Sequence, residues 1–318
     1  MNNGLDVKRL GIFLALAFGL AWIIGLVIFL TGGLVNSPVL VPQLQLTLAV
    51  VLLAVGYMWA PALAHVLTRL LTREGWQDTW LRPHFKRGWR YWLAAWVVPA
   101  LATIVGAAVF FALLPRYFDP DLTMLRGMLA QNAQTATMNP WLIVAAQLGS
   151  AVLIAPLLNG LFTFGEEFGW RGYLLPKLLP LGERRAMLVS GVIWGVWHWP
   201  VIAMGHNYGF GYPGAPWTGM LLMVWFTVVT GCFLAWATLR AGSVWPAVIG
   251  HAAINGISAL GVLLVQGNPS SLLGPLPVGL LGSLGWAAIA GWILWRHAGG
   301  RQAPDVAPDA AGQLPAPH

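Results

Sequence analysis

Charged residues are scarce in this chain. Asp, Glu, Lys and Arg make up 8% of its 318 residues, whereas hydrophobic residues make up 58%. Soluble domains carry about 25% charged residues, so this chain has too little polar surface to cover a soluble fold of its size. The composition therefore predicts a polytopic membrane protein, and long apolar runs of this kind predict an all-α fold.

Cysteine is almost absent, which narrows the chemistry. The single cysteine, Cys232, excludes an internal disulfide framework and a metal site built from several cysteines. It lies in the apolar run WFTVVTGCFLAW, where we expect it only to pack. The chain also lacks the HExxH motif of helical zinc proteases.

The net charge of +7 does not point to nucleic acid, because a basic low-complexity arm is absent. In a membrane protein an excess of Lys and Arg is typical of loops held on the cytoplasmic side. We therefore expect membrane lipids, and no nucleic acid, as partners.

Eight segments have the length of a spanning helix, which needs about 20 mostly apolar residues. They are 9–31, 46–68, 91–114, 141–165 (which could continue to about 175), 185–204, 217–239, 244–266 and 276–296. The first has an apolar core too long for a signal peptide, so we interpret it as a retained anchor.

The distribution of positive charge predicts an orientation. Of the 17 Lys and Arg residues, all but Arg116 and Arg126 fall on one side of this eight-span arrangement. The positive-inside rule assigns that side to the cytoplasm. Both termini should therefore be cytoplasmic. On the opposite side, we expect the longer loop 116–140 to hold a short surface helix.

The organisation follows from the spans. We expect three N-terminal transmembrane helices over 1–139, a core of spans 4–7 over 140–266 and a C-terminal helix over 267–297. The tail 298–318 is rich in Pro, Ala and Gly and lacks apolar periodicity, so it should be disordered.

Two adjacent glutamates are the main anomaly. Of ten acidic residues, only Glu166 and Glu167 fall within or at the inner end of a predicted span. Ionisable residues there are costly and usually line a cavity or pathway, and two neighbouring carboxylates also repel each other, so the pair is a functional-site candidate. Glu167 and Arg171 stand four residues apart and can form an ion pair, whereas Glu166 points about 100° away and has no such local partner.

Three histidines, His65, His198 and His251, also fall within predicted spans. His251 and Asn255 share a helix face at a spacing of four residues. Each of these residues, taken alone, could also have a purely structural role. His65 is typical of a buried hydrogen-bond donor, Arg171 could snorkel to the interface, and His251 with Asn255 could join helices.

Three motifs occur in order: EExxxR from Glu166 to Arg171, an aromatic-xxx-His from Trp194 to His198, and HxxxN from His251 to Asn255. Together they resemble the CAAX-processing and bacteriocin-processing (CPBP, or Abi) family of intramembrane proteases over about 140–266. The second motif of that family usually begins with Phe. Here Trp194 keeps an aromatic residue at this position.

The resemblance implies peptide-bond hydrolysis at a site that is sunk in the membrane and open to the cytosol. It implies Glu166 as the general base that activates a water, with His198 holding that water. His251 and Asn255 would stabilise the oxyanion. The substrate would be a peptide or a lipidated protein, with CaaX-type C-terminal processing as one form.

The resemblance also implies supporting roles. Glu167 with Arg171 would brace the helix, and Trp194 would position His198. The family was named as metalloproteases, so zinc held by Glu166, His198 and His251 stays an alternative. Better-understood relatives favour a glutamate-activated water without a required cofactor.

Three other functions stay open. A rhomboid-like serine protease would use the 282–285 sequence GSLG, but no histidine is placed to partner it. A proton-coupled transporter would use the glutamate pair, but the matched halves typical of transporters are missing. A non-catalytic immunity or scaffolding protein of the same family would share the fold and lack the activity.

Overall fold

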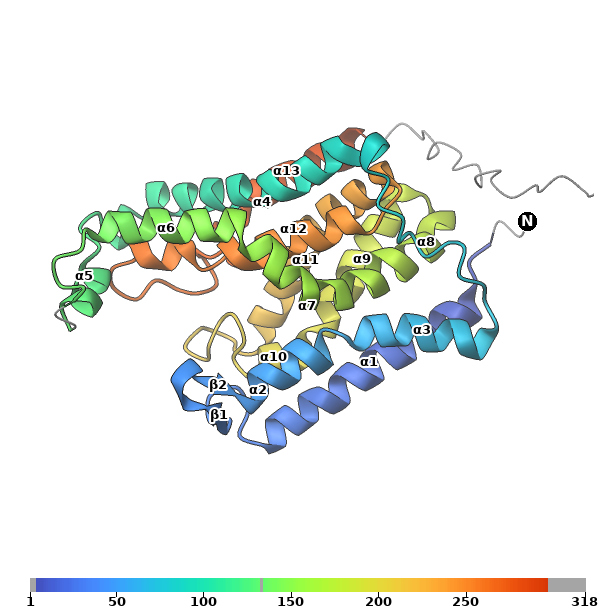
Figure 1. Cartoon of the computed structure of the whole chain (residues 1–318), viewed down its shortest axis with the longest axis horizontal. Helices are drawn as coiled ribbons and strands as arrows, with labels where there is room; N and C mark the ends of the chain where they lie inside the picture. Colours follow the sequence, from blue (N-terminus) through green and yellow to red (C-terminus); the bar gives the residue numbers. More distant parts are fainter. Residues whose placement is uncertain (1–3, 132–133, 297–318) are drawn as a thin grey trace, which may run out of the picture.

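The computed structural model describes residues 4–131 and 134–296, which form a helical bundle with one small hairpin (Figure 1). The predicted all-α fold is confirmed. The longer helices are α1 (Val7–Leu30), α3 (Ala60–Thr72), α4 (Phe85–Leu113), α6 (Pro140–Leu153), α7 (Ala155–Gly169), α9 (Glu183–Trp197), α11 (Trp217–Ala241), α12 (Trp245–Ile257) and α13 (Leu284–Arg296). The predicted disordered tail lies outside the described residues.

Shorter elements connect these helices. They are the strands β1 (Val39–Val41) and β2 (Leu46–Thr47), the helices α2 (Leu48–Val51), α5 (Thr123–Ala130), α8 (Leu175–Leu178) and α10 (Trp199–Ala203), and the π-helical turns η2 (Leu52–Tyr57) and η4 (Trp170–Leu174). Helix α5 is the short helix expected in the loop 116–140. The antiparallel β1–β2 hairpin was not predicted.

The chain is an integral, multi-pass membrane protein. Within the described residues, five helical segments are long and apolar enough to cross a bilayer, and α6 with the helix that follows it makes a sixth if this pair, bent by 47°, is one span. Helices α9 and α13, at 15 and 13 residues, are shorter than the roughly 20 residues of a full span. The predicted count of eight spans is therefore not reached by length alone and stays a prediction.

The last predicted span, 276–296, begins later than expected. Helix α13 starts only at Leu284, because the chain before it folds back on itself. A Cβ atom on Gly282 would overlap the backbone of Leu276, so only glycine permits this turn. Helices α13 and α4 pack closely, since Gly285 lies directly against the backbone of Ala102 in α4.

The arrangement of the ends matches the charge pattern. In Figure 1 the N-terminus and α8 lie at one end of the bundle, whereas the hairpin and α5 lie at the other. Arg116 and Arg126 belong to the α5 end, and the predicted cytoplasmic loops belong to the opposite end. Which end faces the cytosol stays a prediction from the positive-inside rule.

Candidate functional site

Helix α7 carries both glutamates into the interior of the bundle. Gly165 of α7 lies so close to the backbone of Met58 and Trp59, just before α3, that a side chain there would collide with it. Gly169 lies equally close to Pro61 of α3. These close contacts bury the intervening turn, and Glu166 and Glu167 are only 3% and 0% exposed. The π-helical turn η4 follows at once, and such turns are frequent at functional sites.

Glu167 joins two helices. Its Oε1 atom accepts hydrogen bonds from Arg171 Nη1 and from His251 Nδ1, each at 2.8 Å. The Arg171 guanidinium also lies 4.5 Å from the ring centroid of Trp194. The predicted ion pair is therefore present, and the additional bond to His251 fixes α12 against α7.

Glu166 has its partner on another helix. Its Oε2 atom accepts a hydrogen bond from Trp194 Nε1 at 2.7 Å, so the indole of α9 holds this carboxylate. His198 Nδ1 lies 2.8 Å from the carbonyl oxygen of Trp194. The backbone of Trp194, rather than its ring, is thus the hydrogen-bond partner of His198.

These hydrogen bonds define the imidazole tautomers. A carbonyl oxygen only accepts, so His198 Nδ1 carries the proton and Nε2 is left as an acceptor in the neutral ring. His251 Nδ1 likewise donates to the Glu167 carboxylate. Both histidines therefore keep Nε2 available for a substrate or a water.

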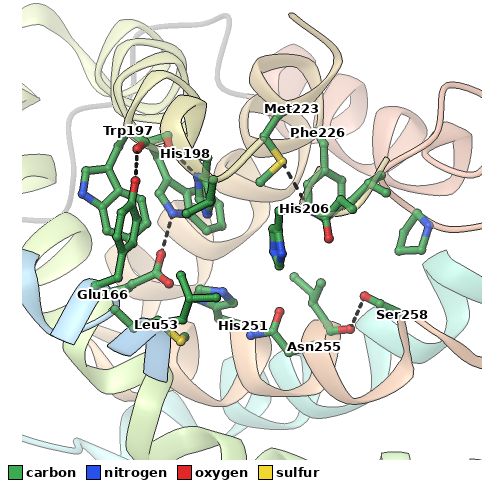
Figure 2. Close-up of a pocket in the computed structure, with 18 of the residues that line it drawn as sticks. Leu53, Glu166, Trp197, His198, His206, Met223, Phe226, His251, Asn255 and Ser258 are labelled. Atoms are coloured by element: carbon green, nitrogen blue, oxygen red, sulfur yellow. Dashed lines mark hydrogen bonds between the residues drawn. The ribbon is translucent and has the colours of Figure 1, made fainter. Parts of the chain in front are cut away.

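One cavity, of about 430 Å³, receives the predicted catalytic groups. Glu166, His198, His251 and Asn255 all line it, together with Trp194 (Figure 2). His198 reaches the cavity because α9 ends at Trp197, well short of a full span. Glu167 and Arg171 are fully buried and do not line the cavity.

Four further polar residues line the cavity without belonging to any motif: Tyr57, His206, Asn207 and Ser258. Tyr57 lies in η2, and its hydroxyl donates to the Trp197 carbonyl oxygen at 2.6 Å. The sequence analysis did not identify these residues, because none is separated from a motif residue by a spacing that predicts a shared helix face. A histidine next to an asparagine in the loop 204–216 was the one available signal.

The remaining walls are apolar. Leu53, Met223, Phe226 and Ile254 are among the lining residues (Figure 2). A largely apolar cavity with a few converging polar groups is typical of a ligand-binding or active site.

The arrangement does not fit a metal centre. Among residues 4–131 and 134–296, no group of three or more His, Cys, Asp and Glu side chains is arranged to hold a metal ion. The arrangement of Glu166, His198 and His251 therefore gives no support to the zinc alternative, and we derive no step through a metal.

His65 is a structural residue, as its interpretation as a buried hydrogen-bond donor predicted. It is fully buried, its Nδ1 lies 2.9 Å from the Phe168 carbonyl oxygen, and its Nε2 accepts from Arg69 Nε at 2.6 Å. It thus supports the helix immediately after the glutamate pair. Cys232 is also fully buried, as expected.

Comparison with known proteins finds a similarity over part of the chain. Residues 140–257 match the family model described as type II CAAX prenyl endopeptidase Rce1-like. A protein named CAAX prenyl protease 2 from Methanococcus maripaludis is 30% identical over 107 residues. That stretch is 33% of this chain and only 38% of the relative, so the likeness spans less than half of either protein. Residues 140–257 are therefore similar to the Rce1-like family, and the resemblance to CAAX-processing proteases predicted from the three motifs is confirmed.

Proposed function

We propose that this protein is an intramembrane endopeptidase that cuts a peptide bond with a water activated by Glu166. The observation that carries the proposal is convergence. Glu166, His198 and His251 come from three different helices and line one cavity. Each is held by a hydrogen bond that leaves at least one polar atom free for chemistry.

The first step is attack by water. Trp194 holds Glu166 Oε2, and Oε1 makes no hydrogen bond to a described residue, so Oε1 is the atom that takes the proton from water. His198 Nε2 accepts the second hydrogen and orients the water. The hydroxide adds to the carbonyl carbon, and Glu166 then passes its proton to the leaving amine nitrogen.

The second requirement is stabilisation of the oxyanion. His251 Nε2 donates to it when the ring is an imidazolium, and the buried Glu167 carboxylate on Nδ1 stabilises that charge. The Asn255 amide supplies a second donor from the same face of α12.

The proposed substrate is a CAAX-type protein C-terminus. The matched family and the Methanococcus maripaludis relative carry that name. Apolar walls suit aliphatic residues, and a lipidated cysteine would keep the substrate at the bilayer. We further propose that the basic end of the bundle and both termini are cytoplasmic and that cleavage serves cytosolic substrates. A transporter or a scaffold gains no support from any contact in the cavity.

The test is cleavage by the purified protein. The peptides are a prenylated Cys-Val-Ile-Met tetrapeptide extended at its N-terminus and the same peptide without the lipid. Wild type should cut the prenylated peptide, and Glu166→Gln should lose at least about 100-fold in rate. Asp121→Asn, which removes an acid in the α5 region, should keep the wild-type rate.

Two results would contradict the proposal. A Glu166→Gln variant that cleaves as fast as wild type would remove the base from the mechanism. Activity that is lost with a chelator and restored by zinc would replace it with the metalloprotease alternative.

A further inference from the structure

The cavity contains a polar group that the proposed mechanism does not use. His206 lies in the loop between α10 and α11, outside the three motifs, and still lines the cavity. In Figure 2 its ring lies beneath Met223 and Phe226 and above Asn255, to the right of Glu166. Asn207 lines the cavity beside it.

The loop holds His206 rigidly. The His206 backbone N–H donates to the Val201 carbonyl at 3.0 Å, and its carbonyl accepts from Tyr208 N–H at 2.8 Å. Asn207 adopts a left-handed conformation with φ 64°, which closes the turn. The Tyr208 hydroxyl donates to the Val278 carbonyl at 2.9 Å and ties the loop to the segment before α13. These contacts fix the backbone from which the His206 side chain extends towards the cavity.

The ring has no partner of its own. Within the described part of the chain, no hydrogen bond or ion pair involves the His206 imidazole, and the Asn207 amide makes only a 3.8 Å contact to Met223 Sδ. The His206 side chain is half-buried and that of Asn207 is exposed, so both present polar atoms at the cavity wall to which a ligand can bind. Burial lowers the pKa of His206, so the ring is neutral in the empty cavity. A bound anion would favour its protonation.

The charge distribution identifies the ligand group. Among the residues that the structure describes, no Lys or Arg lines the cavity, and the one acidic lining residue, Glu166, repels anions. His198 and His251 face Glu166 and are occupied by the proposed chemistry. The site for an anionic end of a substrate is therefore the side of the cavity that carries His206.

We propose that His206, assisted by Asn207, binds the C-terminal carboxylate of the peptide and so sets which bond reaches Glu166. This inference rests on the proposed function, because a CAAX-type substrate ends in a free carboxylate a few residues beyond the bond that is cut. The separation of His206 from Glu166 thus determines how far from the chain end the peptide bond is cut.

The experiment compares two peptides that differ in one group. The prenylated Cys-Val-Ile-Met peptide is offered as the free acid and as the C-terminal amide to wild type, His206→Leu and His206→Gln. A hydrogen bond to a charged group predicts that wild type prefers the free acid by about 10-fold or more in kcat/KM. His206→Leu should lose that preference while still cleaving the amide, and the remaining cleavage shows that the variant is folded. His206→Gln should retain part of the preference, since its amide still donates.

Ser258→Ala is the matched control. Ser258 also lines the cavity, but its hydroxyl already donates to the Ile254 carbonyl at 2.6 Å. This variant should keep the full preference for the free acid. An equal preference in wild type and His206→Leu would overturn the inference and leave the proposed function intact.

Measurements of peptide binding test the carboxylate site if neither peptide is cleaved. If wild type cuts neither peptide, the proposed function fails, and the affinities of both peptides for wild type and His206→Leu are measured by calorimetry. Tighter binding of the free acid in wild type alone upholds the carboxylate site. Equal affinities in both proteins overturn it.

Discussion

The ion pair between Arg171 and Glu167 should couple the two residues strongly in stability. The joined atoms, Arg171 Nη1 and Glu167 Oε1, are 2.8 Å apart, and both side chains are fully buried. At an effective dielectric constant of about 20, two unit charges at that distance attract by about 6 kcal/mol. Part of this attraction offsets lost hydration, so removing one partner costs about 3–5 kcal/mol. We expect Arg171→Met to lower the free energy of unfolding by that amount.

The double variant makes the argument specific. Glu167→Gln removes the charge but keeps an oxygen that can accept from Arg171 and His251. Arg171→Met combined with Glu167→Gln leaves no unpaired buried charge. Its cost should therefore be smaller than the sum of the two single costs by about 1–3 kcal/mol. Equilibrium unfolding in mixed micelles, followed by far-UV circular dichroism, measures all three variants.

A surface pair provides the control. Asp6 Oδ2 and Arg9 Nη1 are also 2.9 Å apart, but their side chains are 36% and 33% exposed. Asp6→Asn should cost less than about 1 kcal/mol, because exposed ion pairs contribute little. If the two single costs at Arg171 and Glu167 add to the double cost within about 0.5 kcal/mol, the pair is not charged in the folded protein and the reasoning is refuted.

Two further predictions concern the helix that carries the glutamates and the loop at its end of the bundle. Gly169→Ala places a methyl group inside Pro61 of α3, so it should cost about 1–3 kcal/mol and reduce proteolysis, whereas Gly160→Ala, with its nearest neighbour 3.8 Å away, should be neutral or stabilising. Thermal unfolding and peptide cleavage test both; equal effects would disprove the tight α3–α7 contact. Partial burial alone would raise the pKa of Asp78, but the hydrogen bond and charge of Arg69, 2.8 Å away, outweigh it and hold that pKa below its ordinary value. The pair should therefore stabilise the fold above the unfolded-state pKa of Asp78, by less than about 1 kcal/mol because Asp78 is 54% exposed, and this contribution should disappear as pH falls through the folded-state pKa. A difference in unfolding between wild type and Asp78→Asn that grows towards low pH would contradict this sign.

Contacts between residues of the same helix could be predicted from their spacing in the sequence. The four-residue separations of Glu167 from Arg171 and of His251 from Asn255 need only helix geometry, which is the same in every α-helix. The ion pair is present, and His251 and Asn255 line one cavity, as those separations predicted. Low charge and long apolar runs likewise predicted the all-α membrane fold.

Contacts between different helices could not be predicted from the sequence. Trp194 bonding Glu166, and His251 bonding Glu167, depend on how α9 and α12 are rotated and shifted against α7. The periodicity of a single sequence does not determine how two helices are rotated and shifted against each other. Glycines allow the close approach of α7 and α3, but the sequence does not say which helix each glycine faces.

Helix ends were the other weak point. Apolarity predicted continuous spans over 185–204 and 276–296, but α9 ends at Trp197 and α13 begins at Leu284. Pro200 and the glycines before α13 interrupt the helices without making the segments less apolar. The short α9 brings His198 to the cavity, and the loop beyond α10 brings His206 there, so these interruptions help to build the site.

The two neighbouring glutamates differ in role because they differ in direction. A rotation of about 100° separates their side chains around α7. Glu167 points into the protein, where Arg171 and His251 both use its Oε1. Glu166 points into the cavity, where Trp194 holds one oxygen and the other stays free for water. Exchange of the two roles would require α7 to turn, and the contacts of Gly165 with Met58 and Trp59 and of Gly169 with Pro61 of α3 prevent that rotation.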